Sequence, residues 1–139
     1  MSVRGRRTQR GASAIELSIV APFFLMLIFS LIQGSLWLYA RNVALSAARE
    51  GASDARLFQP DEYTAGVDAG LKQQLVSYVA TVGNNTLVDT KPEIDYNPGG
   101  SGRVTVTVTG HAIGLTPFDL EVRRSVEMEI EQFEPDLGQ

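Results

Sequence analysis

RGRRTQRGASAIELSIVAPFFLMLIFSLIQGSLWLYA, residues 4–40, is the stretch of sequence that decides the fold. It opens with four arginines, and from Leu17 to Ala40 it holds 24 residues without a charge. A helix rises about 1.5 Å per residue, so this run spans about 36 Å, enough to cross a hydrocarbon core of about 30 Å. We therefore predict one membrane-spanning helix. The arginines are Arg4, Arg6, Arg7 and Arg10.

The arginines also predict the orientation of the chain in the membrane. Basic residues that flank a first membrane span stay in the cytoplasm, so the C-terminal part should be extracytoplasmic. A removed signal peptide is the less favoured alternative, because the apolar core of such a peptide is about 7–15 residues long. A small-residue cleavage site at Ser46-Ala47-Ala48 would lie well beyond the apolar run.

Charge and composition limit the possible functions. The chain has 12 basic and 16 acidic residues, and the first eleven residues hold four of the basic ones and no acid. The remaining 8 basic and 16 acidic residues predict an acidic domain with no nucleic-acid surface. Cysteine is absent, which excludes disulfides and thiol chemistry. About a hundred residues remain outside the membrane, enough for one small domain.

We predict one helix from Ser13 to about Leu57. Ser13 and Glu16 have the spacing of a capping box, and Pro22 invites a kink in the membrane. Trp37 and Tyr39 suit the outer interface. Small residues spaced four apart then form two ridges that would allow another backbone to approach closely. The ridges are Ala40, Ala44, Ala48 and Ala52, beside Ala47, Gly51 and Ala55.

Beyond Pro60 the pattern predicts a second, amphipathic helix and then strands. Asp61 is the expected N-cap, and Gly83-Asn84-Asn85 the expected end. The helix stripe contains Tyr63, Val67, Leu71, Leu75, Tyr78, Val79 and Val82. Alternating residues predict strands at 103–109 and 120–130, with a weaker one at 87–96. The inward positions of the last strand are Leu120, Val122, Arg124, Val126, Met128 and Ile130.

The expected fold class is α+β. A long transmembrane helix extends into a small domain with a second helix and an antiparallel sheet of about three strands, packed on the alanine face of the first helix. The predicted segments are a basic cytoplasmic leader (1–11), a membrane-spanning and extended helix (12–57), an extracytoplasmic domain (58–134) and a tail (135–139).

Glu16 has two interpretations. In the first it only caps the helix. In the second, cleavage between Gly11 and Ala12 frees an α-ammonium on Ala12, which pairs with Glu16 of a neighbouring subunit at low dielectric and sets the register of stacked helices. Gly11 would give a protease open access to the backbone.

The same residues carry a resemblance to a known family. Gly11 and Glu16, with arginines before them and an apolar helix after, resemble the processing signal of type IV pilins and pseudopilins. The segment from Gly11 to Pro22, with residues 39–52, more narrowly resembles the TadE-like proteins, small pseudopilins of tight-adherence (Flp) pilus systems. The resemblance implies a prepilin-peptidase cut between Gly11 and Ala12, with Glu16 acting in processing or assembly.

Other candidate sites are weaker. His111 is the only histidine, and we interpret it as a surface residue at a strand end. Glu127, Glu129 and Glu131 form an acidic edge that discourages aggregation. Ser30 and Gly34 are a possible helix contact in the membrane. No catalytic set, metal site or cofactor motif is recognised.

The predicted function is therefore structural and not enzymatic: a pseudopilin or minor pilin-like bacterial membrane protein that acts in assembling a type IVb (Tad/Flp) pilus. The expected partners are the membrane, other pilin or pseudopilin subunits, the prepilin peptidase and the pilus assembly machinery, with no nucleic acid and no small-molecule substrate. The alternative is a membrane-anchored extracytoplasmic interaction domain that is neither processed nor assembled into a filament.

Overall fold

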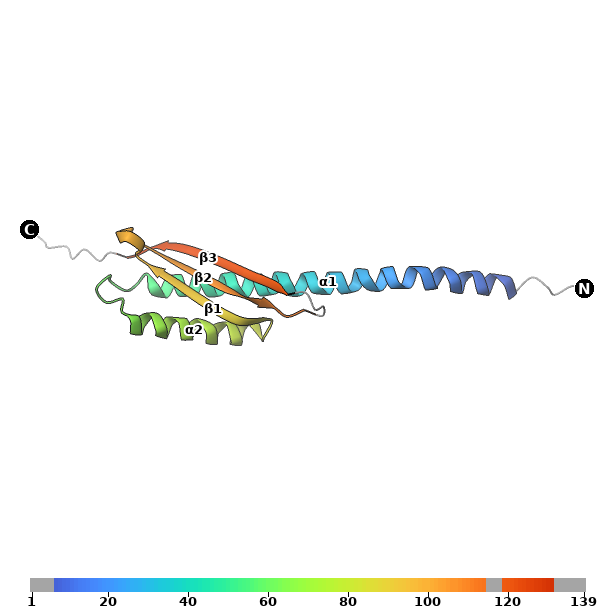
Figure 1. The fold of residues 1–139 in the computed structure, drawn as a ribbon, viewed down its shortest axis with the longest axis horizontal. Helices are drawn as coiled ribbons and strands as arrows, with labels where there is room; N and C mark the ends of the chain where they lie inside the picture. The colour runs from blue at the N-terminus through green and yellow to red at the C-terminus, as the bar shows by residue number, and fades with distance from the viewer. Residues whose placement is uncertain (1–6, 115–118, 132–139) are drawn as a thin grey trace, which may run out of the picture. The chain divides into compact units, whose positions relative to one another are not determined.

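The computed structural model describes residues 7–114 and 119–131, with side chains from Ser13 onward. It confirms the α+β class and every predicted element (Figure 1). Two compact units divide the chain, Met1–Ser35 and Leu36–Gln139. The elements are α1 (Arg7–Ala55), α2 (Ala65–Gly83), β1 (Leu87–Tyr96), the short 3-10 helix η1 (Pro98–Gly100), β2 (Arg103–Ala112) and β3 (Leu120–Glu129).

Helix α1 begins earlier than predicted. Residues 7–12 are already helical, so the prediction of Ser13 as the start of the helix was wrong. Arginine and glutamine are good helix formers, and no proline or cap separates them from the apolar run. Pro22 lies inside the helix, which continues through it. The helix ends at Ala55, within two residues of the prediction.

Helix α2 is capped by Thr64, and the prediction of Asp61 as its cap was wrong. The Thr64 hydroxyl accepts a hydrogen bond from the Val67 amide, the usual N-cap interaction. Asp61 instead lies in a turn in which the amides of Glu62 and Tyr63 donate to the Gln59 carbonyl. The predicted C-terminal end is confirmed: Asn84, at φ 45° and ψ 45°, takes the left-handed conformation that stops helices.

The sheet is antiparallel, in the order β1-β2-β3. The weaker strand prediction at 87–96 is confirmed as β1, which forms an edge of the sheet and carries an irregularity between Val88 and Lys91. Val106 of β2 lies opposite Ile94 on one side and Val126 on the other. Residues 115–118, predicted to join the last two strands, and residues 132–139 lie outside the described residues.

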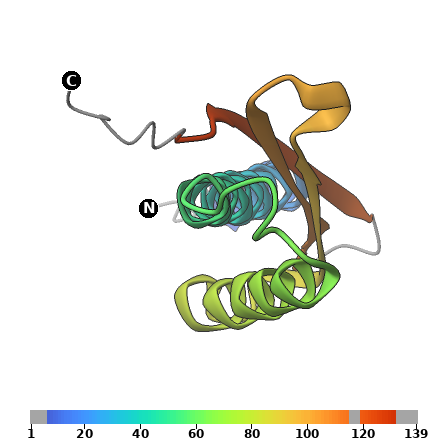
Figure 2. The same ribbon diagram turned by 90° about the vertical axis from the view of Figure 1, so that its left-hand side faces the viewer.

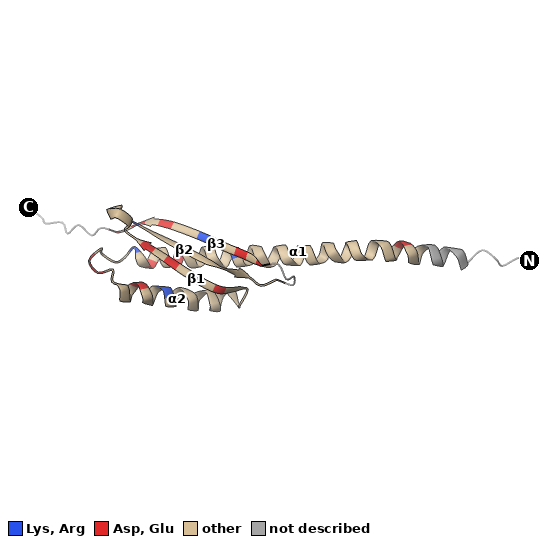
Figure 3. Cartoon of the chain, viewed as in Figure 1, with Lys and Arg blue, Asp and Glu red and all other residues tan. Residues whose placement is uncertain are grey.

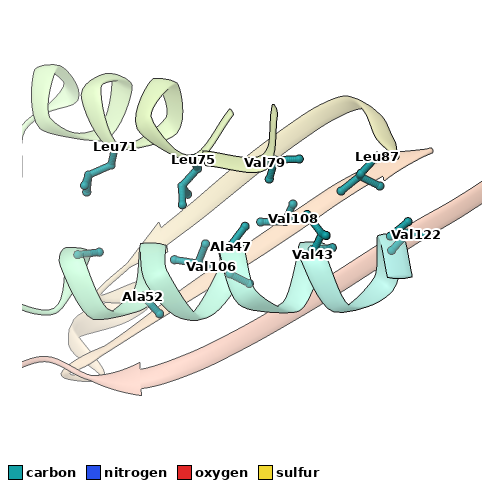
Figure 4. Packing of buried hydrophobic residues seen from close by; sticks show 14 of the residues in the cluster. Val43, Ala47, Ala52, Leu71, Leu75, Val79, Leu87, Val106, Val108 and Val122 are labelled. Carbon is teal, nitrogen blue, oxygen red and sulfur yellow. The ribbon is translucent and has the colours of Figure 1, made fainter. Parts of the chain in front are cut away.

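The core lies between the sheet and the two helices. The second half of α1 and all of α2 cover the same face of the sheet (Figure 2), while the other face stays polar. Figure 4 shows Leu75 of α2 and Ala47 of α1 beside Val106 of β2. The fully buried side chains of largest volume are Leu75, Val79, Val104, Val106 and Val108.

Stacked aromatic rings fasten the connection between the helices to β1. The rings of Tyr63 and Tyr96 lie 3.9 Å apart and nearly parallel, and the Tyr96 hydroxyl donates to the carbonyl of Phe58. Burial raises the pKa of the Tyr63 hydroxyl, and its hydrogen bond to Asp68 raises that pKa further. Tyr63 therefore stays protonated and donates to Asp68 across the physiological range.

Leu75→Ala tests the core. Leu75 is 2% exposed, and truncating such a residue costs about 2–5 kcal/mol of unfolding free energy because the lost contacts leave a cavity. Denaturant unfolding in detergent, followed by the fluorescence of the sole tryptophan, Trp37, measures the change. The control Val76→Ala, 42% exposed on the same helix, should cost much less. Equal costs would place Leu75 outside the core.

Gly51→Val tests the close approach of α1 and α2. A Cβ at Gly51 would lie 2.7 Å from Cδ1 of Leu75 and 3.2 Å from Cγ1 of Val106. We expect a loss of about 1–3 kcal/mol from overpacking. Combining Gly51→Val with Leu75→Ala should cost less than the sum of the two single changes, because the small side chain makes room. Strict additivity in the same unfolding assay would contradict this packing.

Candidate functional site: the N-terminal helix

The predicted processing position lies inside α1. Gly11 and Ala12 both belong to the helix, so a protease that needs an extended substrate must first unwind its opening turns. Glycine favours that opening, because it weakens a helix by about 1 kcal/mol relative to alanine. The side chains before Ser13 are not described, so the structure leaves the cut as a prediction.

Glu16 does not cap the helix. The first four amides of a helix lack internal partners, and six helical residues, 7–12, already precede Ser13. Ser13 lies past them, so its amide needs no partner from Glu16, and the capping-box interpretation was wrong. In the part of the chain with described side chains, no basic group lies within ion-pair distance of Glu16.

The surroundings of Glu16 are apolar and uncovered. Ile15 and Leu17, on either side of it, are 65% and 67% exposed, and large exposed apolar side chains continue along the helix. An 18-residue window of α1 has a mean hydropathy of 2.4, and the chain itself buries none of that window. Among the described residues, α1 is the one helix that is long and apolar enough to cross a membrane, which fits a single-pass membrane protein. The charge coloring of α1 shows the long uncharged stretch (Figure 3).

The hydroxyl groups in this apolar stretch are satisfied within the helix. Ser18, Ser30 and Ser35 each donate to the carbonyl four residues earlier, at 2.8 Å. Such bonds remove the cost of an unpaired hydroxyl in lipid. Open space surrounds Gly34, where an added Cβ would meet nothing within 4 Å. The predicted Ser30–Gly34 contact therefore has no partner within the described part of this chain.

The aromatic residues predicted for the membrane interface also attach to the folded domain. Trp37 packs against the core, and the guanidinium of Arg41 lies over its ring at 5.5 Å from the centroid. The Tyr39 hydroxyl donates to the Val82 carbonyl at 3.0 Å, which links α1 to the end of α2. No pattern in the chain indicated this pairing, because the two residues are 43 positions apart.

The alanine ridges are used inside the subunit. Their alanines are all 0% exposed, and they contact the strands and α2 of the same chain. The prediction that the alanine face of the first helix packs on the domain is therefore confirmed. These ridges leave no small-residue surface on this part of α1 for a second subunit. The alanines are Ala40, Ala44, Ala47, Ala48, Ala52 and Ala55.

The weaker candidates have structural partners. His111 Nδ1 lies 2.5 Å from Asp119 Oδ1, a carboxylate that the sequence did not place. Glu127 pairs with Arg103 at 2.7 Å, and Glu131 with Arg56 at 3.1 Å, so the acidic edge is partly neutralised. Among the described residues, no group of three possible ligands could hold a metal ion.

Comparison with known proteins adds one finding. No curated protein and no solved structure matches this chain. The family model described as TadE-like protein matches residues 11–53, which include Gly11, Ala12 and Glu16 and most of α1. Over residues 11–53 the chain is therefore similar to TadE-like proteins, as its motif predicted.

Proposed function

We propose that this protein is a pseudopilin or minor pilin-like subunit that acts in assembling a Tad (Flp) pilus. Its role is structural: α1 holds the subunit in the membrane and later packs against like helices. The C-terminal domain, on the extracytoplasmic side, presents a surface to other subunits. The TadE-like match over residues 11–53 supports the association with a Tad pilus.

The position of Glu16 is the observation that carries this proposal. A carboxylate in an apolar helix is costly near lipid and is normally retained because it meets a partner. Helix capping does not account for it, since α1 is already helical at Arg7, nine residues earlier. Cleavage after Gly11 would supply the missing partner, because Ala12 would gain a positive charge.

The spacing of the two groups suits a register device. Ala12 and Glu16 are four residues apart, which puts them on one face of the helix with a rise of about 6 Å between them. In a stack of parallel helices, the amine of one subunit meets the carboxylate of a neighbour only at a defined axial offset. At low dielectric, an offset that leaves either charge unpaired is penalised.

The first prediction concerns the cut. The N-terminal sequence of the protein from its native cell should begin at Ala12. Gly11→Val should leave the chain unprocessed, because the β-branched side chain blocks the protease's access to the bond. This steric effect should outweigh any effect of valine on the local unwinding of the helix. The control Gly34→Ala, at a position with open space, should be processed normally. A native chain that still carries its arginines would favour the membrane-anchored alternative.

The second prediction concerns Glu16→Gln. Removing one partner of a buried ion pair costs about 3–5 kcal/mol. The amount of Glu16→Gln protein in sheared surface filaments should therefore fall by about tenfold or more. The amount of protein in the membrane should stay unchanged. Ser13→Ala is the control, and should assemble normally because Ser13 does not cap α1. Wild-type incorporation of Glu16→Gln would refute the register mechanism.

A further inference from the structure

A groove of about 360 Å³ lies beside the second half of α1, within the unit formed by residues 36–139. Its walls come from α1 and from β3, the edge strand. Neither the proposed register device nor the processing signal uses any of its residues. The lining residues are Leu38, Arg41, Asn42, Leu45, Arg124 and Ser125.

Arg124 occupies an unusual position in this groove. It belongs to the inward set of β3, opposite Val108, where the alternation otherwise places apolar residues. An inward arginine on an edge strand can discourage pairing with another sheet. That explanation accounts for Arg124 alone. It does not account for a second arginine, Arg41, across the same groove on α1.

The two guanidinium groups make the groove locally positive. Among the described residues, no carboxylate lies within ion-pair distance of Arg41 or Arg124. Residues 36–139 carry 8 basic and 15 acidic residues, so a lining whose described residues include two arginines and no acid departs from the character of the domain. The Trp37 ring holds the Arg41 guanidinium in place. The groove therefore favours an anion.

The apolar part of the lining indicates the kind of anion. Leu38, which is 52% exposed, belongs to the last turn of the uncharged run 17–40, and Arg41 is the first charge after that run. In a membrane-spanning helix, this position corresponds to the level of the lipid headgroups. A ligand at this level carries a phosphate and has apolar carbon beside it.

We propose that this groove binds the phosphate of an anionic phospholipid. Arg41 and Arg124 pair with the phosphate oxygens, as arginine forks do. Asn42 supplies a further polar group, and Leu38 contacts the glycerol and upper acyl carbons. The bound lipid fixes the acidic domain beside an anionic surface that would otherwise repel it. This proposal requires a membrane-spanning α1 but neither cleavage nor filament assembly.

The test uses the full chain in detergent, with bound phospholipid counted by native mass spectrometry. Wild type should retain phosphatidylglycerol in preference to phosphatidylcholine. Arg124→Gln and Arg41→Gln should each weaken retention of phosphatidylglycerol about fivefold, the effect of one basic residue near a membrane surface. Arg123→Gln is the matched control: the neighbouring residue is exposed and opposite Thr109 on the outer face, and its loss should change nothing.

Two further measurements keep the result clear. Denaturant unfolding establishes that each variant folds. If Arg124→Gln does not fold, Arg41→Gln alone provides the test. Arg124→Lys should restore part of the retention.

Equal retention of the two lipids by wild type, or equal losses in Arg123→Gln and Arg124→Gln, would overturn the proposal. So would displacement of the lipid by inorganic phosphate at equal concentration, which would indicate a site for a soluble anion. Glu16→Gln should retain lipid as wild type does, so this test and that of filament assembly fail independently.

Discussion

The contact between the small-residue face of α1 and the valine face of β2 is the interaction on which the domain depends. A sheet of three strands has one apolar face and needs a helical layer to cover it. Helix α2 covers part of that face, and the buried turns of α1 cover the rest. Alanine and glycine are required there because Leu75 and Val106 already fill the space beside Gly51.

Because of this contact, the two parts of α1 lie in different environments. Up to Ser35 its large apolar side chains are exposed, and a membrane is the environment that would satisfy them. From Ala40 onward its alanines are the core of a folded domain. The second part of α1 cannot be withdrawn for packing between subunits without unfolding that domain. Any helix-to-helix contact in a filament is therefore expected to involve the first part, where Glu16 lies.

Electrostatics distinguishes the two parts as well. Near the start of α1, a single carboxylate lies in an apolar stretch, where a charge without a partner is expensive. Where the uncharged run ends, two arginines face a groove in an otherwise acidic domain. In both places the charge has no counterpart among the described side chains. We interpret both as sites for a partner outside the chain: an amine for Glu16, and a phosphate for Arg41 and Arg124.

The sequence by itself determined the elements, because local patterns are sufficient to specify them. An uncharged run of membrane length, a 3.6-residue stripe and two-residue alternation identified the helices and strands, and the N-terminal motif identified the TadE-like segment. The ends were less certain. Thr64 rather than Asp61 caps α2, and α1 begins at Arg7 rather than Ser13, since several residues near each end are compatible with a cap.

Only the tertiary structure decided which residues meet. It brought Tyr39 to the carbonyl of Val82, His111 to Asp119, and Arg124 to the groove beside Arg41. These pairs depend on how helices and strands pack, and no periodic pattern in the sequence indicates that packing. The alanine ridges show the same limit: their spacing indicated a close approach, but only the fold showed that both helix and sheet of the same subunit fill it.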